Sequence, residues 1–433
     1  MKNNARIAQV GKPRIVIIGG GFAGIQLAKA LRKADVQVVL IDKNNHHTFQ
    51  PLLYQVATAG LEADSIIHPF RKGFESQKNF YFRMGNVECI DTEKKVVETS
   101  IGSVSYDYLV IATGAVTNYY GNEQIKKNAV PIKCIEDALA LRNTILGNFE
   151  QALLTEEEDE LNSLMDYVVV GGGPTGVEVA GALAELKKHV FPKDYRELDF
   201  VKMDIHLIEG TPRLLNGMSE EASQKALEFL KELGVQVWTN CFVKSYDGYT
   251  VELDNGKKLI TRSLIWAAGV IGSPIEGIRP ESIIKGRRLK VDSCNRVEGY
   301  ENIFAIGDVA AMITENTPRG HPMMAPPAMQ QGTLLGENIQ NLLTGKPLKP
   351  FIYKDKGSMA TIGRNKAVVD LKAFKTQGFF AWFIWMFVHL ISIVGYRNRL
   401  VVFTNWLWSY FSYDKGLRLI VGKKENKVTD SVL

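Results

Sequence analysis

Residues 14–24 read RIVIIGGGFAG, an apolar run that ends in glycines, and this stretch decides the fold. The helical pattern IQLAKALRKA and the apolar run QVVLID follow it, which predicts strand, tight turn, helix and strand in that order. Gly19, Gly21 and Gly24 satisfy G-x-G-x-x-G, and Asp42 ends the second strand. Such glycines allow the tight turn, a close approach of backbone to a pyrophosphate and close helix packing, while the acid accepts hydrogen bonds from ribose hydroxyls. A dinucleotide site is therefore predicted here in preference to a merely tight turn.

A second copy of this arrangement starts at residues 166–176, DYVVVGGGPTG, followed by the helical run VEVAGALAELKK. Its glycines are Gly171, Gly173 and Gly176. The returning strand DIHLIEG ends in Glu209, 36 residues after Gly173, because the insert HVFPKDYRELDFVKM lengthens the connection. A carboxylate at Glu209 would repel a 2′-phosphate, which favours NADH, although Arg213 close behind leaves NADPH open as an alternative.

Two nucleotide sites in one chain indicate a tightly held flavin beside an exchangeable nicotinamide, because a hydride donor needs an acceptor cofactor. The four cysteines lie far apart at 89, 134, 241 and 294, which excludes a C-x-x-C dithiol and metal-ligand spacing, so we expect no metal site. Three further runs, 106–115, 263–274 and 301–310, read as buried strands that end in turns. The last ends at Asp308 before a predicted helix, where the acid either binds the ribityl chain of a flavin or caps that helix.

These motifs together resemble the two-dinucleotide-binding flavoprotein superfamily, through the paired glycine patterns, the A-T-G at residues 112–114 and the I-G-D at 306–308. Within it, four segments resemble type II NADH:quinone oxidoreductases. They are NNHHTFQPLLYQVATAG (44–60), GGGPTGVEVAGAL (171–183), APPAMQQG (325–332) and GSMATIGRNKAV (357–368). The resemblance covers roughly residues 14–420, nearly the whole chain.

The resemblance implies an α/β fold with two Rossmann-like dinucleotide-binding domains, as in glutathione-reductase-like flavoproteins, and a C-terminal membrane-associating helical segment. It implies hydride transfer from NADH to non-covalent FAD and then reduction of a membrane quinone, menaquinone or ubiquinone, without proton pumping. The residues expected to bind the cofactors are Gly19, Gly21, Gly24, Asp42, Lys43, Gln50, Thr113, Gly114, Asp308, Gln330, Gly171, Gly173, Gly176, Glu178, Glu209 and Gly269.

Two of these residues, Glu178 and Gln330, are expected to be catalytic. Glu178 follows the second glycine motif on the first helical turn, where we expect it to face the nicotinamide and the flavin and to bind a carboxamide or pass protons; alternatively it is a favourable charge at a helix N-terminus. Prolines precede the helical run that carries Gln330 and Gln331, so the positive end of that helix can point at a flavin. The resemblance places Gln330 at the flavin edge and quinone channel; the alternative is a polar residue on a solvated helix face. Many relatives carry an additional Gln near the position of Pro326, which this chain lacks.

The C-terminal tail indicates a membrane surface. Residues 379–394 are apolar except for His389 and Ser392, which is short for a span of about 20 residues, and 401–411 form a second aromatic-rich run. These two runs hold four of the six tryptophans. From Arg364 onward eleven side chains are basic and four are acidic. The positive net charge of the chain, +5, is therefore concentrated in this tail and does not favour nucleic acid as a partner. We expect these two runs to form amphipathic helices that lie in one leaflet of the membrane, in preference to a transmembrane helix. The alternative is a buried helix that packs within the protein or in a dimer.

Length and composition predict two or three domains: 433 residues, 45% hydrophobic and 23% charged. We expect a discontinuous FAD domain at 1–135 and 270–350, an NADH domain at 136–269, and a membrane-anchoring and dimerisation region at 351–433. We expect a homodimer that is bound peripherally (monotopic) to the cell membrane. The cytoplasmic face is expected, since no secretory signal is evident.

Three competing functions stay open on the sequence. A sulfide:quinone oxidoreductase shares the fold but needs cysteines beside the flavin, and a soluble ferredoxin or disulfide reductase would not need the aromatic tail. A non-enzymatic, NADH-responsive flavoprotein would reduce its flavin once and then stall.

Overall fold

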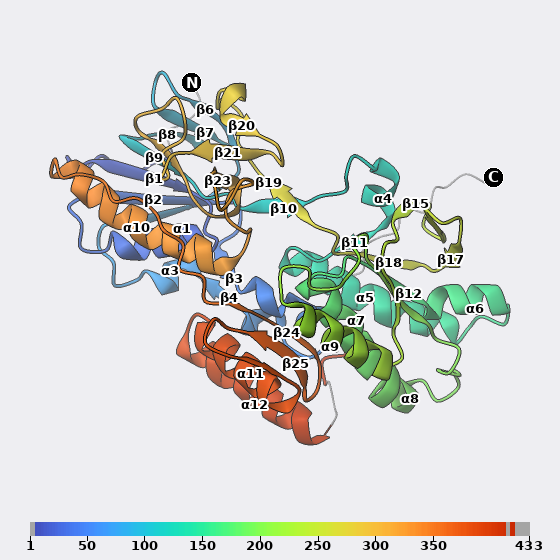
Figure 1. The fold of residues 1–433 in the computed structure, drawn as a ribbon. Helices are drawn as coiled ribbons and strands as arrows, with labels where there is room; N and C mark the ends of the chain where they lie inside the picture. The colour runs from blue at the N-terminus through green and yellow to red at the C-terminus, as the bar shows by residue number, and fades with distance from the viewer. Residues whose placement is uncertain (1–4, 413–415, 421–433) are drawn as a thin grey trace. The chain divides into compact units, whose positions relative to one another are not determined.

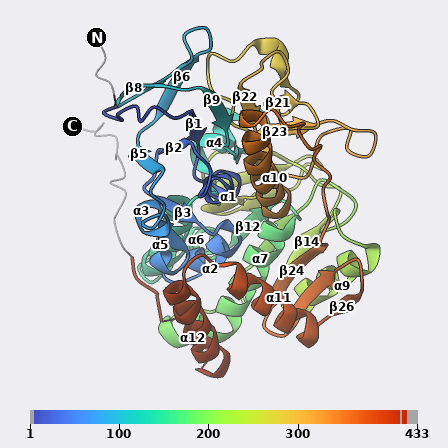
Figure 2. The same cartoon turned by 90° about the vertical axis from the view of Figure 1, so that its left-hand side faces the viewer.

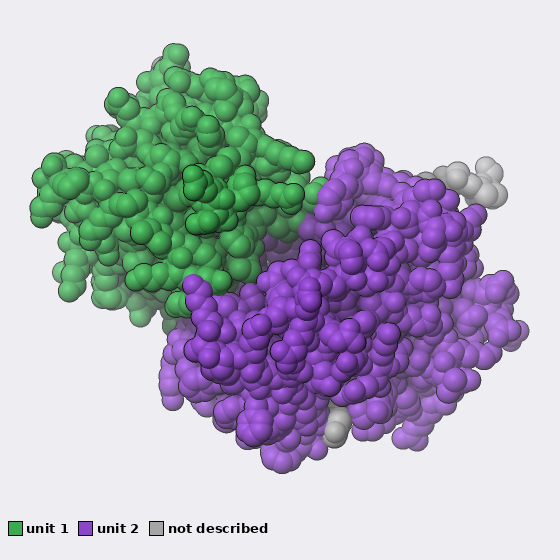
Figure 3. Space-filling model, viewed as in Figure 1, with its two compact units in different colours: residues 1–48, 67–118, 270–356 green, residues 49–66, 119–269, 357–433 purple. Residues whose placement is uncertain are grey.

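The computed structural model describes residues 5–412 and 416–420, and this part of the chain divides into two compact units (Figure 3). Unit 1 comprises residues 1–48, 67–118 and 270–356. Unit 2 comprises residues 49–66, 119–269 and 357–433. Each unit is therefore assembled from three separate stretches of sequence.

A five-stranded parallel sheet forms the centre of unit 1, in the order β22-β9-β1-β2-β5. Its strands are β22 (Ile303–Ala305), β9 (Tyr108–Ile111), β1 (Arg14–Ile18), β2 (Gln37–Asp42) and β5 (Phe80–Met84). All five residues of β1 are buried, as parallel strands covered on both faces require. Helices α1 (Phe22–Ala30) and α10 (Ala325–Leu343) lie side by side in both ribbon views (Figures 1 and 2).

Smaller elements complete unit 1. They are β3 (His46–Thr48), β4 (Ile67–Pro69), α3 (Phe70–Gly73), β6 (Val87–Asp91), β7 (Val96–Thr99), β8 (Gly102–Ser105), β10 (Ala115–Thr117), β19 (Val270–Gly272), η3 (Pro280–Ser282), β20 (Ile283–Ile284), β21 (Arg288–Val291), η4 (Gly307–Val309) and β23 (Ala310–Met312). The helix predicted after Asp308 is wrong: the chain makes only the 3-10 turn η4 and then pairs as β23 with β21. Strand pairing of a short apolar run outweighs its helical preference here.

Unit 2 contains a second parallel sheet, in the order β11-β18-β12-β13-β14. Its strands are β11 (Val130–Pro131), β18 (Ser263–Trp266), β12 (Tyr167–Val170), β13 (Ile205–Ile208) and β14 (Gln236–Trp238). The helices around it are α4 (Glu123–Asn128), α5 (Ile135–Ala152), α6 (Glu158–Met165), α7 (Pro174–His189), α8 (Phe191–Asp194) and α9 (Glu220–Glu232). An antiparallel sheet of β15 (Val243–Tyr246), β16 (Thr250–Leu253) and β17 (Lys258–Ile260) adjoins them.

The C-terminal part of unit 2 is an antiparallel sheet followed by two helices. The strands are β24 (Ser358–Gly363), β25 (Lys366–Asp370) and β26 (Lys375–Gln377), and the helices are α11 (Phe379–Ser392) and α12 (Tyr396–Ser412). α7 approaches β24 so closely that a Cβ atom at Gly181 would overlap the carbonyl oxygen of Ile362. The short elements η1 (Gln50–Leu52), α2 (Leu53–Ala57) and η2 (Ala63–Ser65) also belong to this unit.

This division differs from the predicted domain boundaries in two places. Residues 49–66 and 119–135, expected in the FAD domain, group with unit 2, where α2 packs on α5 and α7. The C-terminal region 351–433, expected to stand alone, is divided: residues 351–356 group with unit 1, and the rest groups with unit 2, where β24 contacts α7. Which nucleotide each unit binds stays a prediction.

Candidate active site

The first glycine turn in unit 1 has the shape that a dinucleotide needs. Gly19 has a φ of 101°, which side chains rarely adopt, and a Cβ atom there would overlap the carbonyl oxygen of Ala112. A Cβ atom at Gly24 would overlap the carbonyl oxygen of Gly19, so this glycine lets α1 pack against the turn. Around Gly21, by contrast, a Cβ atom would meet no atom within 4 Å. The backbone is thus open at the one position where a pyrophosphate must approach.

The second turn, in unit 2, repeats this geometry. Gly171 has a φ of 111° and its Cβ position overlaps the carbonyl oxygen of Ala267, while a Cβ atom at Gly176 would overlap Gly171. Space is open at Gly173. Among the described residues no side chain caps the N-termini of α1 and α7, so the positive end of each helix dipole can face an anion. Both cradles therefore fit a dinucleotide pyrophosphate.

The two predicted ribose acids hold their own glycine turns. Asp42 accepts hydrogen bonds from the amides of Gly20, at 2.6 Å, and Asn44, at 2.7 Å. Glu209 accepts from the amides of Gly172 and Thr211 in the same way. Each carboxylate oxygen keeps a second lone pair for a ribose hydroxyl. Burial raises the pKa of Asp42, and the two amide hydrogen bonds offset part of that rise.

The carboxyl ends of β1, β9 and β22 gather further predicted residues of unit 1 at one sheet edge. Thr113 follows β9 and donates its hydroxyl to the carbonyl of Ser273 at 2.6 Å, and Gly114 has a φ of 69°. Asp308 follows β22 in η4, half-buried, where its charge acts on buried Arg288. Ligands of open α/β sheets bind at this edge.

Gln330 and Gln331 on α10 have different surroundings. Gln330 donates to the carbonyl of Lys354 at 2.9 Å and accepts from its amide at 3.0 Å. Gln331 is only 2% exposed and accepts from the amide of Gly307 at 2.7 Å, so it supports the turn that carries Asp308. The role of Gln330 at a quinone stays a prediction, and Gln331 is a supporting residue that the sequence pattern alone did not distinguish.

Apart from Glu178, the remaining residues predicted to bind the cofactors are Lys43, Gln50 and Gly269. Lys43 is exposed after β2. Gln50 is exposed at the start of η1, 3.5 Å from the ammonium group of Lys133. Gly269, after β18, has a φ of 139° that suits glycine.

Glu178 lies in a cavity within unit 2. Its side chain is 8% exposed, and burial raises the pKa of its carboxyl well above the ordinary value; the amide of Thr361 and the indole of Trp385 offset only part of that rise. Its burial does not fit the alternative prediction of a solvated charge at a helix terminus. The buried environment of this side chain therefore favours its protonated form.

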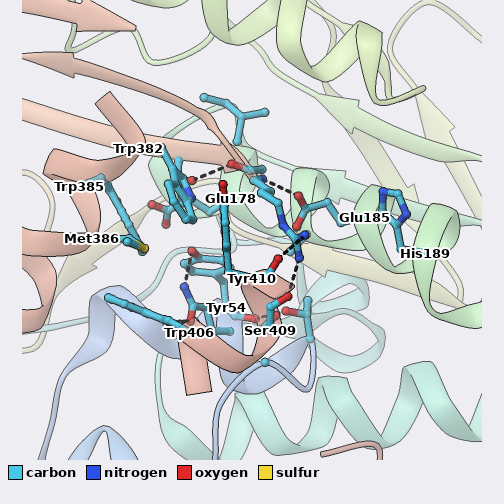
Figure 4. A pocket seen from close by; sticks show the side chains of 18 of the residues that line it. Tyr54, Glu178, Glu185, His189, Trp382, Trp385, Met386, Trp406, Ser409 and Tyr410 are labelled. Atoms are coloured by element: carbon cyan, nitrogen blue, oxygen red, sulfur yellow. Dashed lines mark hydrogen bonds between the residues drawn. The ribbon is translucent and has the colours of Figure 1, made fainter. Parts of the chain in front are cut away.

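Aromatic side chains form much of the cavity wall (Figure 4). The cavity has a volume of about 110 Å³ and lies between α2, α7, β24, α11 and α12. The rings of Trp385 and Trp406 are 5.7 Å apart, and Trp382 stacks on Tyr410 at 5.4 Å. Tyr54 meets Trp385 edge-on at 6.4 Å.

The cavity corrects one expectation about the tail. Three of its four tryptophans, which we expected at the lipid headgroups, line the cavity instead, and Trp385 is only 1% exposed. Only Trp408 is on the open surface of the helices, at 67% exposure. Because both faces of α11 are apolar, the sequence pattern alone did not distinguish its packed face.

Comparisons with known proteins agree on the family. Residues 13–332 match the family model described as pyridine nucleotide-disulphide oxidoreductase, and residues 356–412 match the NDH2 C-terminal domain. A type II NADH:quinone oxidoreductase of Mycobacterium tuberculosis is 35% identical over 422 residues, covering 93% of this chain and 89% of that protein. A protein of the same description from Staphylococcus aureus is 30% identical over 364 residues, covering 82% of this chain and 89% of that protein.

The solved structures show the same fold. NDH2 from Plasmodium falciparum, solved in complex with NADH, matches with a TM-score of 0.86 at 24% identity, covering 95% of this chain and all of that chain. A sulfide:quinone oxidoreductase from Aquifex aeolicus matches with a lower TM-score of 0.72 at 21% identity, covering 95% of this chain and 96% of that chain.

Proposed function

Because the chain belongs to the type II NADH:quinone oxidoreductase family, we propose that unit 1 holds FAD, unit 2 binds NADH, and the cavity beside Glu178 receives a quinone head group. FAD, when bound, accepts a hydride from NADH and passes two electrons to a quinone. The observation that carries the quinone site is a buried carboxyl group, whose pKa burial raises, in a cavity lined by aromatic rings. Flat aromatic walls suit a quinone ring, whose oxygens take up protons on reduction.

The residues of the two cradles bind and orient the nucleotides. The open backbone at Gly21 and at Gly173 leaves room for a pyrophosphate, and the positive N-terminal ends of α1 and α7 stabilise its charge. Asp42 and Glu209 accept from the riboses, and the carboxylate of Glu209 disfavours a 2′-phosphate. Glu178 donates a proton to a quinone oxygen. Gln330, on α10 of unit 1, is proposed to face the flavin edge.

Turnover with a soluble quinone tests this function. We expect NADH to bleach the visible flavin absorbance of the detergent-purified protein under anaerobic conditions, and each addition of a water-soluble menaquinone or ubiquinone analogue to restore the colour. NADPH should bleach more slowly because of Glu209. Colour that never returns would instead mean another electron acceptor or an NADH-responsive sensor.

The two C-terminal helices are proposed to lie on a membrane. Among residues 5–412 and 416–420, no helix is both long and apolar enough to cross a bilayer. Large apolar side chains of α11 and α12 nevertheless face outward: Phe379, Phe380, Phe383, Phe387, Val388, Ile391, Tyr396, Leu400, Phe403, Leu407, Trp408 and Phe411. Such a surface is typical of helices that rest in one leaflet, and the basic tail would meet anionic lipid. The free cysteines suit the reducing, cytoplasmic side of the membrane.

Removing the exposed aromatic rings should release the protein from lipid. We expect serine at five positions to weaken binding to anionic vesicles about 100-fold or more, because each ring loses its apolar burial. The positions are Phe380, Phe383, Phe387, Trp408 and Phe411. Flavin content and turnover with a soluble quinone should stay unchanged, since these rings do not line the cavity.

The matched control places serine at Leu154 and Val201, which are 87% and 85% exposed away from these helices. Equal loss of vesicle binding in both proteins, or no loss in either, would contradict the proposed surface.

A homodimer is also proposed, since the same apolar face can pair two chains. Sedimentation equilibrium in detergent checks this oligomeric state.

A further inference from the structure

The reaction of the proposed function needs one proton from water. A quinone that becomes a quinol takes up two electrons and two protons, whereas NADH supplies two electrons and one proton as it becomes NAD⁺. Glu178, after giving its proton to a quinone oxygen, is left as a buried carboxylate and must be reprotonated before the next turnover. The cavity that holds Glu178 must therefore admit protons.

We propose that Tyr54, Glu185 and His189 pass protons from the surface to Glu178, so that the cavity face of α7 is the proton inlet of the enzyme. This inference rests on the proposed function and adds residues to it. Positions 178, 182, 185 and 189 are spaced so that they fall on one face of a helix, and all four line the cavity. Figure 4 shows Glu178, Glu185 and His189 following one another along α7.

The burial of these side chains decreases along α7 from Glu178 to His189. Glu178 is buried, whereas Glu185 and His189, the last residue of α7, are partly exposed. A helix rises about 1.5 Å per residue, so Glu178 and Glu185 are separated by about 10 Å along the axis and need a carrier between them. The row thus leads from the enclosed acid toward solvent with one gap.

Tyr54 fills that gap from α2. Its side chain lines the same cavity as Glu178 and Glu185, and both carboxyl groups raise the pKa of its phenol. Its oxygen accepts a hydrogen bond from Gln55 at 2.8 Å, and Gln55 in turn accepts from the indole of Trp406 at 2.7 Å. The proton of the phenol is therefore available to an acceptor in the cavity. A volume of about 110 Å³ also admits several water molecules.

The charged groups around the outer end suit proton entry. Arg364 donates its backbone amide to Glu185 and its guanidinium to the carbonyls of Ser409, at 2.6 Å, and Tyr410, at 2.9 Å. Burial lowers the pKa of His189, the cations of Lys188, Arg364 and Lys193 lower it further, and Glu185 raises it. A neutral imidazole beside a carboxylate exchanges protons readily with water near neutral pH.

The variant Glu185→Gln separates proton transfer from structure. Glutamine keeps an oxygen for the amide of Arg364 but cannot carry a proton, so we expect kcat with quinone to fall about tenfold. The KM for quinone and the single-turnover bleaching by NADH should stay unchanged, because neither needs a proton from water. Millimolar acetate or imidazole should restore part of kcat, and His189→Gln should show a smaller loss with the same rescue.

The control is Glu232→Gln, the same change at an exposed residue of α9 that pairs with Lys366 outside the cavity. It should behave as the wild type. Wild-type kcat in Glu185→Gln would overturn the proposal, as would a loss in both Glu185→Gln and Glu185→Ala that small acids do not rescue.

A measurement without substrate distinguishes failure of the inlet from failure of the proposed function. The carboxyl stretching band of Glu178, identified by its loss in Glu178→Gln, shifts in infrared spectra when the proton exchanges in D₂O. We expect this exchange to be about tenfold slower in Glu185→Gln and in Tyr54→Phe than in the wild type. Equal exchange in all proteins would overturn the inlet whatever the electron acceptor is.

Discussion

Glu178→Gln is expected to lower turnover with quinone by about 100-fold, the lower end of what a positioned acid contributes. The reason is that glutamine fills the same space beside Trp385 and Thr361 but holds no proton to donate. Bleaching of the bound FAD by NADH should continue at the wild-type rate, so stopped-flow absorbance separates the two half-reactions. Unchanged nicotinamide affinity and unchanged turnover together would contradict a functional role for Glu178.

The same substitution should change how stability depends on pH. The folded-state pKa of Glu178 is raised, so the folded protein binds this proton more tightly than the unfolded chain does. Its contribution to stability is therefore fully present below the unfolded pKa and is lost as pH rises through the folded value. Thermal unfolding of Glu178→Gln and wild type should agree near pH 4 and diverge above it, with the variant more stable at pH 8. A gap that narrows with rising pH would contradict a protonated Glu178.

Gly176→Ala is expected to abolish measurable NADH oxidation while the protein keeps its flavin. The added methyl group would overlap the carbonyl oxygen of Gly171, so the turn or α7 must move. Overpacking of this kind costs about 1–3 kcal/mol, or about 2–10 °C in Tm. FAD should remain bound because unit 1 has its own glycine turn. Flavin absorbance, calorimetry and NADH titration measure the three effects.

Two other glycines provide controls for this variant. Gly173→Ala enters open space, so Tm should be unchanged, but the methyl group occupies the place of the pyrophosphate and should raise the KM for NADH about tenfold. Gly147→Ala, on α5, also meets no atom within 4 Å; it should leave the KM for NADH unchanged and raise Tm slightly, because alanine is favoured over glycine inside a helix. Retained NADH binding in Gly176→Ala would contradict the assignment of this turn.

The two glycine turns were predictable because their geometry is local. Each is contained within about ten residues, and the structure confirms for both the tight first glycine, the open second and the closely packed third. The acids that end the second strands could be predicted for the same reason. Backbone sterics act over short separations and leave a direct mark in the sequence.

The environment of Glu178 was not predictable from its neighbours. Its position after Gly176 indicated the nucleotide, whereas Thr361 and Trp385, which line the cavity with it, are about 200 residues further along the chain. Gln330 and Gln331 illustrate the same limit on a smaller scale: adjacent and chemically identical, they differ only in which contact tertiary packing gives them. Long-range packing decides such roles, and no local pattern reports it.

The discontinuity of the two units governs the order in which the chain can fold during synthesis. In unit 1, Ile303 of β22 pairs with Leu109 of β9, and in unit 2, β24 closes against Gly181 of α7. The first sheet thus lacks an edge strand until about two thirds of the chain has been synthesised, and unit 2 stays open still longer. Closing such long loops costs chain entropy before the contacts stabilise the fold. This slows folding and prolongs the exposure of apolar strands. We therefore expect a nascent chain of this protein to expose apolar strands until its last hundred residues arrive.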